Sequence, residues 1–157
     1  MLLANKNLLM RAILIGGTIA GVIDVFAASI INHIGPGIIL QAIASGVAGK
    51  AAFAGGGATM VLGLVLQICM SILIAAIFMV AATKIDLLRR PALWGALYGI
   101  GVYGVMTFVV VPLSQAHANY PATLAAALPD LVAMIVFGLI VAFTPGFLGR
   151  ATLRGNG

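Results

Sequence analysis

The chain has 157 residues, of which 63% are hydrophobic and only 7% are charged, and its mean hydropathy is +1.24. Water-soluble domains carry a charge on roughly a quarter of their residues, so this composition excludes an ordinary soluble protein. The net charge of +5 does not indicate nucleic-acid binding, because the basic residues stand at the ends of apolar stretches, where membrane topology places them. The sequence therefore predicts a single membrane domain over residues 1–157 that contacts the lipid bilayer.

Four apolar stretches are long enough to cross a bilayer, which takes about 20 residues of helix. We expect the transmembrane helices at about residues 12–32, 58–82, 91–111 and 123–147. Gly35-Pro36-Gly37 breaks the helical pattern after the first stretch. Pro91 suits the first turn of the third helix, and Pro112 follows its expected end. The expected fold is an all-α integral membrane protein, a four-helix bundle.

The stretch between the first two predicted helices, residues 35–57, is too rich in glycine to span a bilayer and too apolar for an ordinary loop. Non-helical backbone at membrane depth is tolerated only against protein or water. We therefore predict a short external helical or re-entrant segment, whose glycines pack closely on the membrane helices. The residues that we assign to this segment are Gly46, Gly49, Lys50, Phe53, Gly55, Gly56 and Gly57.

The basic residues predict the orientation of the helices. Of the eight lysines and arginines, all but Lys50 fall on one side of the four-helix arrangement. Loops that stay in the cytoplasm are enriched in lysine and arginine. Both termini and the loop at residues 87–90 are therefore expected in the cytoplasm.

Asp24 lies near the middle of the first predicted helix, about 20 Å along the helix axis from Arg11. A carboxyl group at that depth costs at least about 2.5 kcal/mol, so it should face the interior of the bundle. Small residues share its helical face, and Gly17 with Gly21 forms a GxxxG pair typical of helix packing. Two interpretations stay open: a proton or cation site, or a protonated, hydrogen-bonded carboxyl that holds helices in register.

Three further polar residues fall at depths that would bring them near Asp24. Gln67 lies in the second predicted helix, Tyr103 in the third and Asp130 in the fourth. If Asp24 is neutral it can donate one hydrogen bond, with Gln67 or Tyr103 as its acceptor. Asp130 directly follows Pro129, and its alternative role is to complement the N-terminus of the regular part of the last helix.

The third predicted helix carries a stripe of small residues that indicates helix packing. Gly95, Gly99 and Gly104 make up this stripe. Trp94 and Tyr98 lie near its cytoplasmic end, where aromatic residues are usually membrane-interface anchors.

The chain offers few groups for catalysis or metal binding. His33 and His117 fall at external helix ends, where solvated side chains are usual. A closed zinc site takes about four ligands, and a haem site needs histidines inside facing helices, so we predict no metal and no cofactor. Cys69 is expected to be a small buried residue. No set of catalytic residues is recognised, and enzymatic or redox function is the least favoured interpretation.

The segment Ile43-Ala-Ser-Gly-Val-Ala-Gly-Lys-Ala-Ala-Phe-Ala-Gly-Gly56 resembles a known signature. It is similar to the IASGxxG[RK]xAFxGG stretch of a family of small four-helix bacterial inner-membrane proteins, distantly YagU-like, whose role is not assigned. Residues 17–24, 90–99 and 106–114 also match that family. The resemblance implies a multi-pass protein of the bacterial cytoplasmic membrane and supplies no chemistry. Family members often carry a histidine where this chain has Gln67, which weakens a histidine-based redox or metal role.

Two classes of function remain. The favoured one is a non-enzymatic helical subunit or scaffold that binds a partner protein or a lipid, because the chain has stripes of glycine and alanine without a catalytic set. The alternative is a small oligomeric proton- or ion-coupled transporter or channel with Asp24 at its centre. The expected partners are the lipid bilayer and either another membrane protein or further copies of the chain.

Overall fold

The computed structural model describes residues 6–116 and 123–154, and within these ranges the chain is helical without β-strands. The elements in chain order are α1 (Lys6–Ile31), α2 (Pro36–Ala48), the 3-10 helix η2 (Gly49–Ala54), α3 (Gly56–Lys84), the 3-10 helix η3 (Leu87–Arg89), α4 (Pro91–Val105), the π-helical turn η4 (Met106–Val110), α5 (Val111–Leu113) and α6 (Leu124–Arg154).

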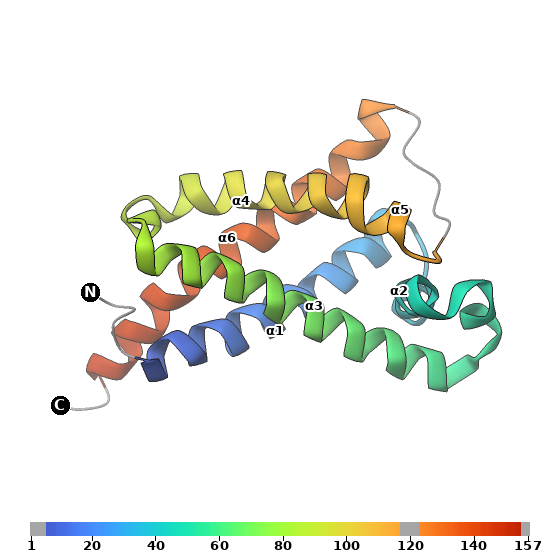
Figure 1. Cartoon of the computed structure of the whole chain (residues 1–157), viewed down its shortest axis with the longest axis horizontal. Helices are drawn as coiled ribbons and strands as arrows, with labels where there is room; N and C mark the ends of the chain where they lie inside the picture. Colours follow the sequence, from blue (N-terminus) through green and yellow to red (C-terminus); the bar gives the residue numbers. More distant parts are fainter. Residues whose placement is uncertain (1–5, 117–122, 155–157) are drawn as a thin grey trace.

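The long helices α1, α3, α4 and α6 pack side by side along the length of the molecule (Figure 1). α1 lies between α3 and α6, and α6 also packs on α4. The start of α1, the η3 connection and the end of α6 lie at one end of this bundle, whereas α2 and η2 lie at the opposite end (Figure 1). The fold therefore brings most of the basic residues to a single end.

Five helical stretches are long and apolar enough to cross a membrane, and the fifth is the segment Pro36–Ala54 that we expected to be external. Its first part, α2, has 13 residues and is therefore about 20 Å long, whereas a bilayer core is about 30 Å thick. α2 begins beside the end of α1 and η2 ends beside the start of α3, at the same end of the bundle (Figure 1). The segment thus covers that end and does not run along the bundle.

α1 ends in a Schellman motif that the sequence did not indicate. The backbone N–H of Ile34 donates to the carbonyl oxygen of Ser29 at 3.2 Å, and that of His33 donates to Ile30 at 3.3 Å. His33 takes the left-handed conformation that this motif needs, with φ 54°. Pro36 then lies in the first turn of α2. The backbone N–H groups of a first turn have no partner within the helix, so proline, which lacks this group, costs no hydrogen bond there.

The third long helix does not end at Val111 as expected. It continues through Pro112 to Leu113, after the π-helical turn Met106–Val110. A proline within a helix removes one hydrogen bond and clashes with the carbonyl four residues earlier. The wider π turn just before Pro112 accommodates that clash. The last helix, α6, also continues through both of its prolines.

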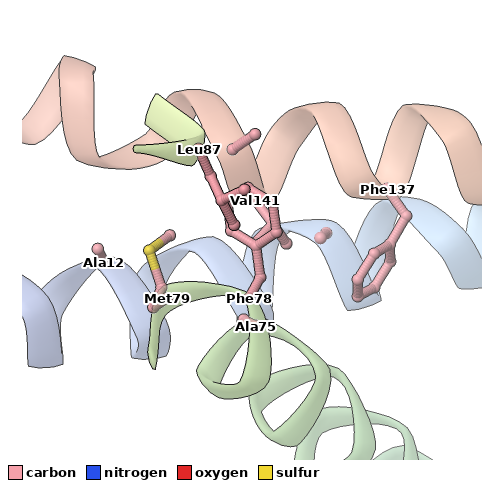
Figure 2. Packing of buried hydrophobic residues seen from close by; sticks show 9 residues of the cluster. Ala12, Ala75, Phe78, Met79, Leu87, Phe137 and Val141 are labelled. Carbon is pink, nitrogen blue, oxygen red and sulfur yellow. The ribbon is translucent and has the colours of Figure 1, made fainter. Parts of the chain in front are cut away.

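The buried core lies toward the end of the bundle that carries the basic residues and joins α1, α3, η3 and α6 (Figure 2). Its nine members are Ala12, Ala20, Ala75, Phe78, Met79, Leu87, Phe137, Val141 and Ala142. Many larger apolar side chains of all four long helices lie on the outside instead. A soluble monomer rarely exposes apolar surface of this extent, so this distribution is typical of a protein surrounded by lipid.

Tyr98 is not the interface anchor that we expected. Its side chain is half-buried, and its hydroxyl donates a hydrogen bond of 2.6 Å to the carbonyl oxygen of Ile74 in α3. Its ring also contacts Phe78, with 5.1 Å between ring centroids and a tilt of 58°. Tyr98 therefore joins α4 to α3, because a hydroxyl in an apolar surrounding requires a partner.

Candidate functional site

Asp24 is partly buried on the side of α1 that meets α3 and α6. Gly17 and Gly21 precede it on the same side. A Cβ atom added at Gly17 would lie 2.8 Å from the Cα atom of Ile72, and one added at Gly21 would lie 2.8 Å from the Cβ atom of Ser71. Only glycine permits this approach of α1 to α3, which sets the position of the Asp24 carboxyl.

Gln67 of α3 holds that carboxyl. Its side-chain Nε2 donates to Asp24 Oδ2 at 2.9 Å and to the carbonyl oxygen of Gly21 at 3.2 Å. The carbonyl oxygen of Gly21 can only accept, so it fixes which end of the Gln67 amide faces α1. We expected Asp24 to donate and Gln67 to accept; the observed direction is the reverse, and Asp24 is the acceptor.

The other two members of the expected polar cluster are placed differently. Asp130 of α6 lies within electrostatic range of Asp24. Tyr103 is partly buried on α4, and the structure gives it no hydrogen bond to Asp24 within the described ranges. The structure therefore brings together Asp24, Gln67 and Asp130, while Tyr103 makes no hydrogen bond to this cluster within the described ranges.

A groove lies between the second half of α1 and the first half of α6, with a volume of about 570 Å³. It is lined by six residues of each helix, and Asp24 is the one polar residue among the twelve. Phe137 lines it and is itself part of the core, where it points from α6 toward α1 (Figure 2). Exposed side chains such as Ile23 and Val132 flank it, so it opens on the outer face of the bundle. Ligand pockets typically have volumes of about 300–1,000 Å³.

The second oxygen of the Asp24 carboxyl, Oδ1, is not fully buried, and Asp24 lines this groove. Within the described ranges the structure gives Oδ1 no hydrogen-bond partner, and no side-chain polar atom there is both fully buried and unpaired. One oxygen of Asp24 is thus held by Gln67, and the other has no hydrogen-bond partner within the described ranges.

The segment at residues 35–57, which we expected to be external, is packed, but less tightly than we expected. The side chain of Gln41 is buried, and its Nε2 lies 3.4 Å from the Gly56 carbonyl oxygen. The Thr59 hydroxyl donates to the carbonyl oxygen of Ala52 at 2.7 Å. The backbone N–H of Gln115 donates to the carbonyl oxygen of Gly46 at 3.0 Å. These bonds join α2 and η2 to the start of α3 and to the turn that follows α5.

The glycines of this segment have different reasons to be glycine. Gly49 and Gly56 have φ values of 59° and 56°, which residues other than glycine rarely adopt. The expected close packing is wrong for Gly56 and Gly57, because a Cβ atom added to either would have nothing within 4 Å. At Gly46 such an atom would make only an ordinary contact of 3.8 Å, and at Gly55 it would clash with Thr59. Lys50 and Phe53 are both exposed.

Helices α4 and α6 pack closely where they cross, and both helices have glycine at the contact. A Cβ atom added at Gly95 would lie 2.9 Å from the Gly138 carbonyl oxygen, and one added at Gly99 would lie 2.7 Å from the Ile135 Cα atom. Gly104, which we included in the same stripe, has nothing within 4 Å of an added Cβ atom and does not pack on a neighbouring helix. We had not singled out Gly138, although it supplies the α6 half of this crossing.

Gly63 is a second close contact that we missed. A Cβ atom there would lie 2.6 Å from the carbonyl carbon of Leu40, so α2 rests directly on the backbone of α3. An isolated glycine in a long apolar helix was the only signal in the sequence, and it did not identify α2 as the partner.

The residues considered for metal or thiol chemistry are dispersed. His33 is exposed at the end of α1, and His117 lies outside the described residues. No group of three His, Cys, Asp or Glu side chains within residues 6–116 and 123–154 is arranged to hold a metal ion. Cys69 is exposed on α3 and not buried as we expected, because it faces away from the helices that α3 contacts.

No family model, curated protein or solved structure matches the chain. The resemblance to the small inner-membrane family therefore stays a prediction. The groove and its carboxyl are the features from which a function has to be argued.

Proposed function

We propose that this chain is an integral membrane protein of the bacterial cytoplasmic membrane, in which α1, α3, α4 (with η4 and α5) and α6 are the four spans. Their apolar outer faces support this proposal, as does the position of α2 at one end of the bundle. Lys6, Lys84 and Arg89 belong to the opposite end, which the excess of positive charge assigns to the cytoplasm together with both termini.

Labelling of single cysteines in intact cells tests this topology. In a Cys69→Ser background, Ala51→Cys and Ala116→Cys should react with a membrane-impermeant maleimide added outside, whereas Asp86→Cys should react only after the membrane is opened. Asp86 and Ala51 are both exposed, so access to the reagent differs only by the side of the membrane. Reaction of all three from the same side would contradict the four-span arrangement.

The function that the geometry supports best is a non-enzymatic helical subunit that binds an apolar molecule of the bilayer, such as a lipid chain, in the groove between α1 and α6. The groove itself supports this conclusion, because it has the volume of a ligand pocket and opens on the outer face of the bundle, which this proposal places in the lipid. Eleven of the twelve lining residues are apolar, so burial of an apolar molecule against them is favourable.

Photo-crosslinking in nanodiscs tests this function. A phospholipid with a photoreactive acyl chain should label the groove residues of α1 and α6 several-fold more than the exposed outer face of α3 around Val61 and Val65. Ala133→Phe places a ring in the groove and should remove that excess. Ala92→Phe makes the same change at an exposed position of α4 and should not. Even labelling of all lipid-facing positions would contradict the proposal.

Proton- or ion-coupled transport is the second candidate, because Asp24 lines the groove and one of its oxygens has no hydrogen-bond partner in the part of the chain that the structure describes. Asp24→Asn retains an acceptor for Gln67 but cannot exchange a proton. Under this candidate the variant should stay folded and lose flux driven by a pH gradient in liposomes. Asp24→Leu leaves the Gln67 amide without its partner and should destabilise the protein by about 1–3 kcal/mol under either candidate. An unchanged flux in the Asn variant would exclude Asp24 from transport.

A further inference from the structure

We propose that the groove between α1 and α6 selects amphiphilic organic cations, with the positive group at Asp24 and the apolar body along the rest of the groove. This inference rests on the proposed role of the groove as a binding site and names the chemical class of its ligand. It follows from the lining of the groove, from the charges around Asp24 and from the depth at which Asp24 lies.

The lining separates one charged position from an otherwise continuous apolar surface. Asp24 is the only one of the twelve lining residues with a polar side chain, and the others are Ala, Ile, Leu, Val, Pro and Phe. A neutral lipid chain would use the apolar surface but would leave the second oxygen of Asp24 without a partner. A cation with an apolar body contacts the apolar surface and also pairs with the Asp24 oxygen. A binding site prefers such a ligand over one that leaves its polar group unpaired.

The titratable groups at and near the groove are acidic, and no basic side chain lines it. Asp130 lies within electrostatic range of Asp24. No lysine, arginine or histidine lines the groove, and the nearest basic residue along α1, Arg11, is about 20 Å away along the helix axis. Charged side chains inside membrane proteins pair with each other or mark a ligand or ion pathway. A bound cation would supply the missing positive charge.

The depth of Asp24 fits a ligand that enters from the bilayer. Asp24 is seven residues from the end of α1, about 10 Å below the external end of the helix. The flanking side chains Ile23, Ile30 and Val132 are exposed on the outer face. An amphiphilic cation already dissolved in the lipid reaches such a groove laterally, without crossing a water-filled channel.

Binding of two probes of the same shape tests the inference. Tetraphenylphosphonium carries a positive charge, and tetraphenylsilane is its neutral counterpart. With the full-length protein in nanodiscs, and empty nanodiscs subtracted, we expect saturable binding of the cation at least tenfold tighter than that of the neutral probe. Asp24→Asn should weaken cation binding at least about tenfold, as loss of a desolvated charge partner does, and should leave binding of the neutral probe unchanged.

Two control variants make the result specific to the groove. Asp86→Asn removes the same charge from an exposed position in the α3–α4 connection and should leave cation binding unchanged. Ala133→Phe should prevent binding of both probes, whereas Ala92→Phe should prevent neither. A circular dichroism melt of each variant shows that it is folded.

The outcomes distinguish this inference from the proposed function beneath it. If both probes bind equally well and Asp24→Asn changes neither, the groove is an apolar binding site and the selection of cations is wrong. If neither probe binds saturably, or Ala133→Phe has no effect, the groove is not a binding site and both proposals fail.

Discussion

The crossing of α4 and α6 allows a sharp test of the structure, because two glycines of α4 stand two residues apart with opposite surroundings. A Cβ atom added at Gly99 would lie 2.7 Å from the Cα atom of Ile135 and 2.8 Å from the carbonyl carbon of Met134. Both are backbone atoms of α6 and cannot rotate away. An added Cβ atom at Gly101 would have nothing within 4 Å.

The magnitude follows from comparing the two Gly→Ala variants. Alanine is the better helix former by up to about 1 kcal/mol, and this gain is common to both sites. Gly99→Ala also forces α4 and α6 apart, and overpacking of this kind costs about 1–3 kcal/mol. The difference in the free energy of unfolding between the two variants is therefore the overpacking alone, and Gly99→Ala should be less stable than Gly101→Ala by about 1–3 kcal/mol.

Unfolding by SDS from mild detergent micelles measures this difference. Loss of helical circular dichroism reports unfolding, and fluorescence of Trp94, the only tryptophan, reports α4 itself. Gly138→Ala, on the α6 side of the same crossing, should behave like Gly99→Ala, because its Cβ atom would lie 2.8 Å from the Gly99 backbone nitrogen. Equal stabilities within about 0.5 kcal/mol, the range of neutral surface substitutions, would refute the packing of α4 on α6.

Three further changes have expected results of the same kind, measured by the same unfolding assay. Gly56→Leu should destabilise by about 1–2 kcal/mol because its φ of 56° is strained for any other residue, whereas Gly57→Leu, next to it in open space, should be near neutral; equal effects would contradict the backbone argument. Tyr98→Phe should cost about 0.5–1.5 kcal/mol, because it removes the hydrogen bond to Ile74 and keeps the ring; an unchanged stability would mean that this bond is not made. Gln67→Leu should cost about 1–3 kcal/mol by leaving the groove carboxyl without its donor, and a variant as stable as the parent would show that this bond does not hold α1 to α3.

The glycines of α4 show what the sequence can predict and where we misread it. Gly95 and Gly99 are four residues apart and lie on one helix face, and both pack on α6. Gly104 is five residues beyond Gly99, about 140° around the helix. Helix periodicity alone therefore places Gly104 outside the stripe. The sequence does not predict that α6 is the helix on which this stripe packs. The contact on α6 consists of Gly138 and backbone atoms, which form no recognisable pattern in the sequence.

The polar contacts were also predicted only in part from the sequence. Matching depths along two helices predicted that Gln67 and Asp24 would lie near each other, since a polar group in an apolar bundle seeks a partner. Depth did not predict the direction of the hydrogen bond, because the carbonyl oxygen of Gly21 decides it and belongs to the backbone. Tyr103 has a suitable depth but makes no hydrogen bond to Asp24 within the described ranges, whereas Tyr98, which we assigned to the interface, makes the bond between α4 and α3.

The position of the groove carboxyl depends on two helix contacts with different properties. On the α3 side Gly17 and Gly21 pack against backbone and Ser71, and Gln67 adds a hydrogen bond, so the carboxyl is fixed relative to α3. On the α6 side a groove lies between α1 and the first half of α6, and within the described ranges Asp24 makes no hydrogen bond to α6. A ligand at the second oxygen therefore meets a carboxyl already oriented by α3, and forfeits little freedom of that side chain on binding. The α3 contact is thus the part of the fold that prepares the groove, although α3 contributes no residue to its lining.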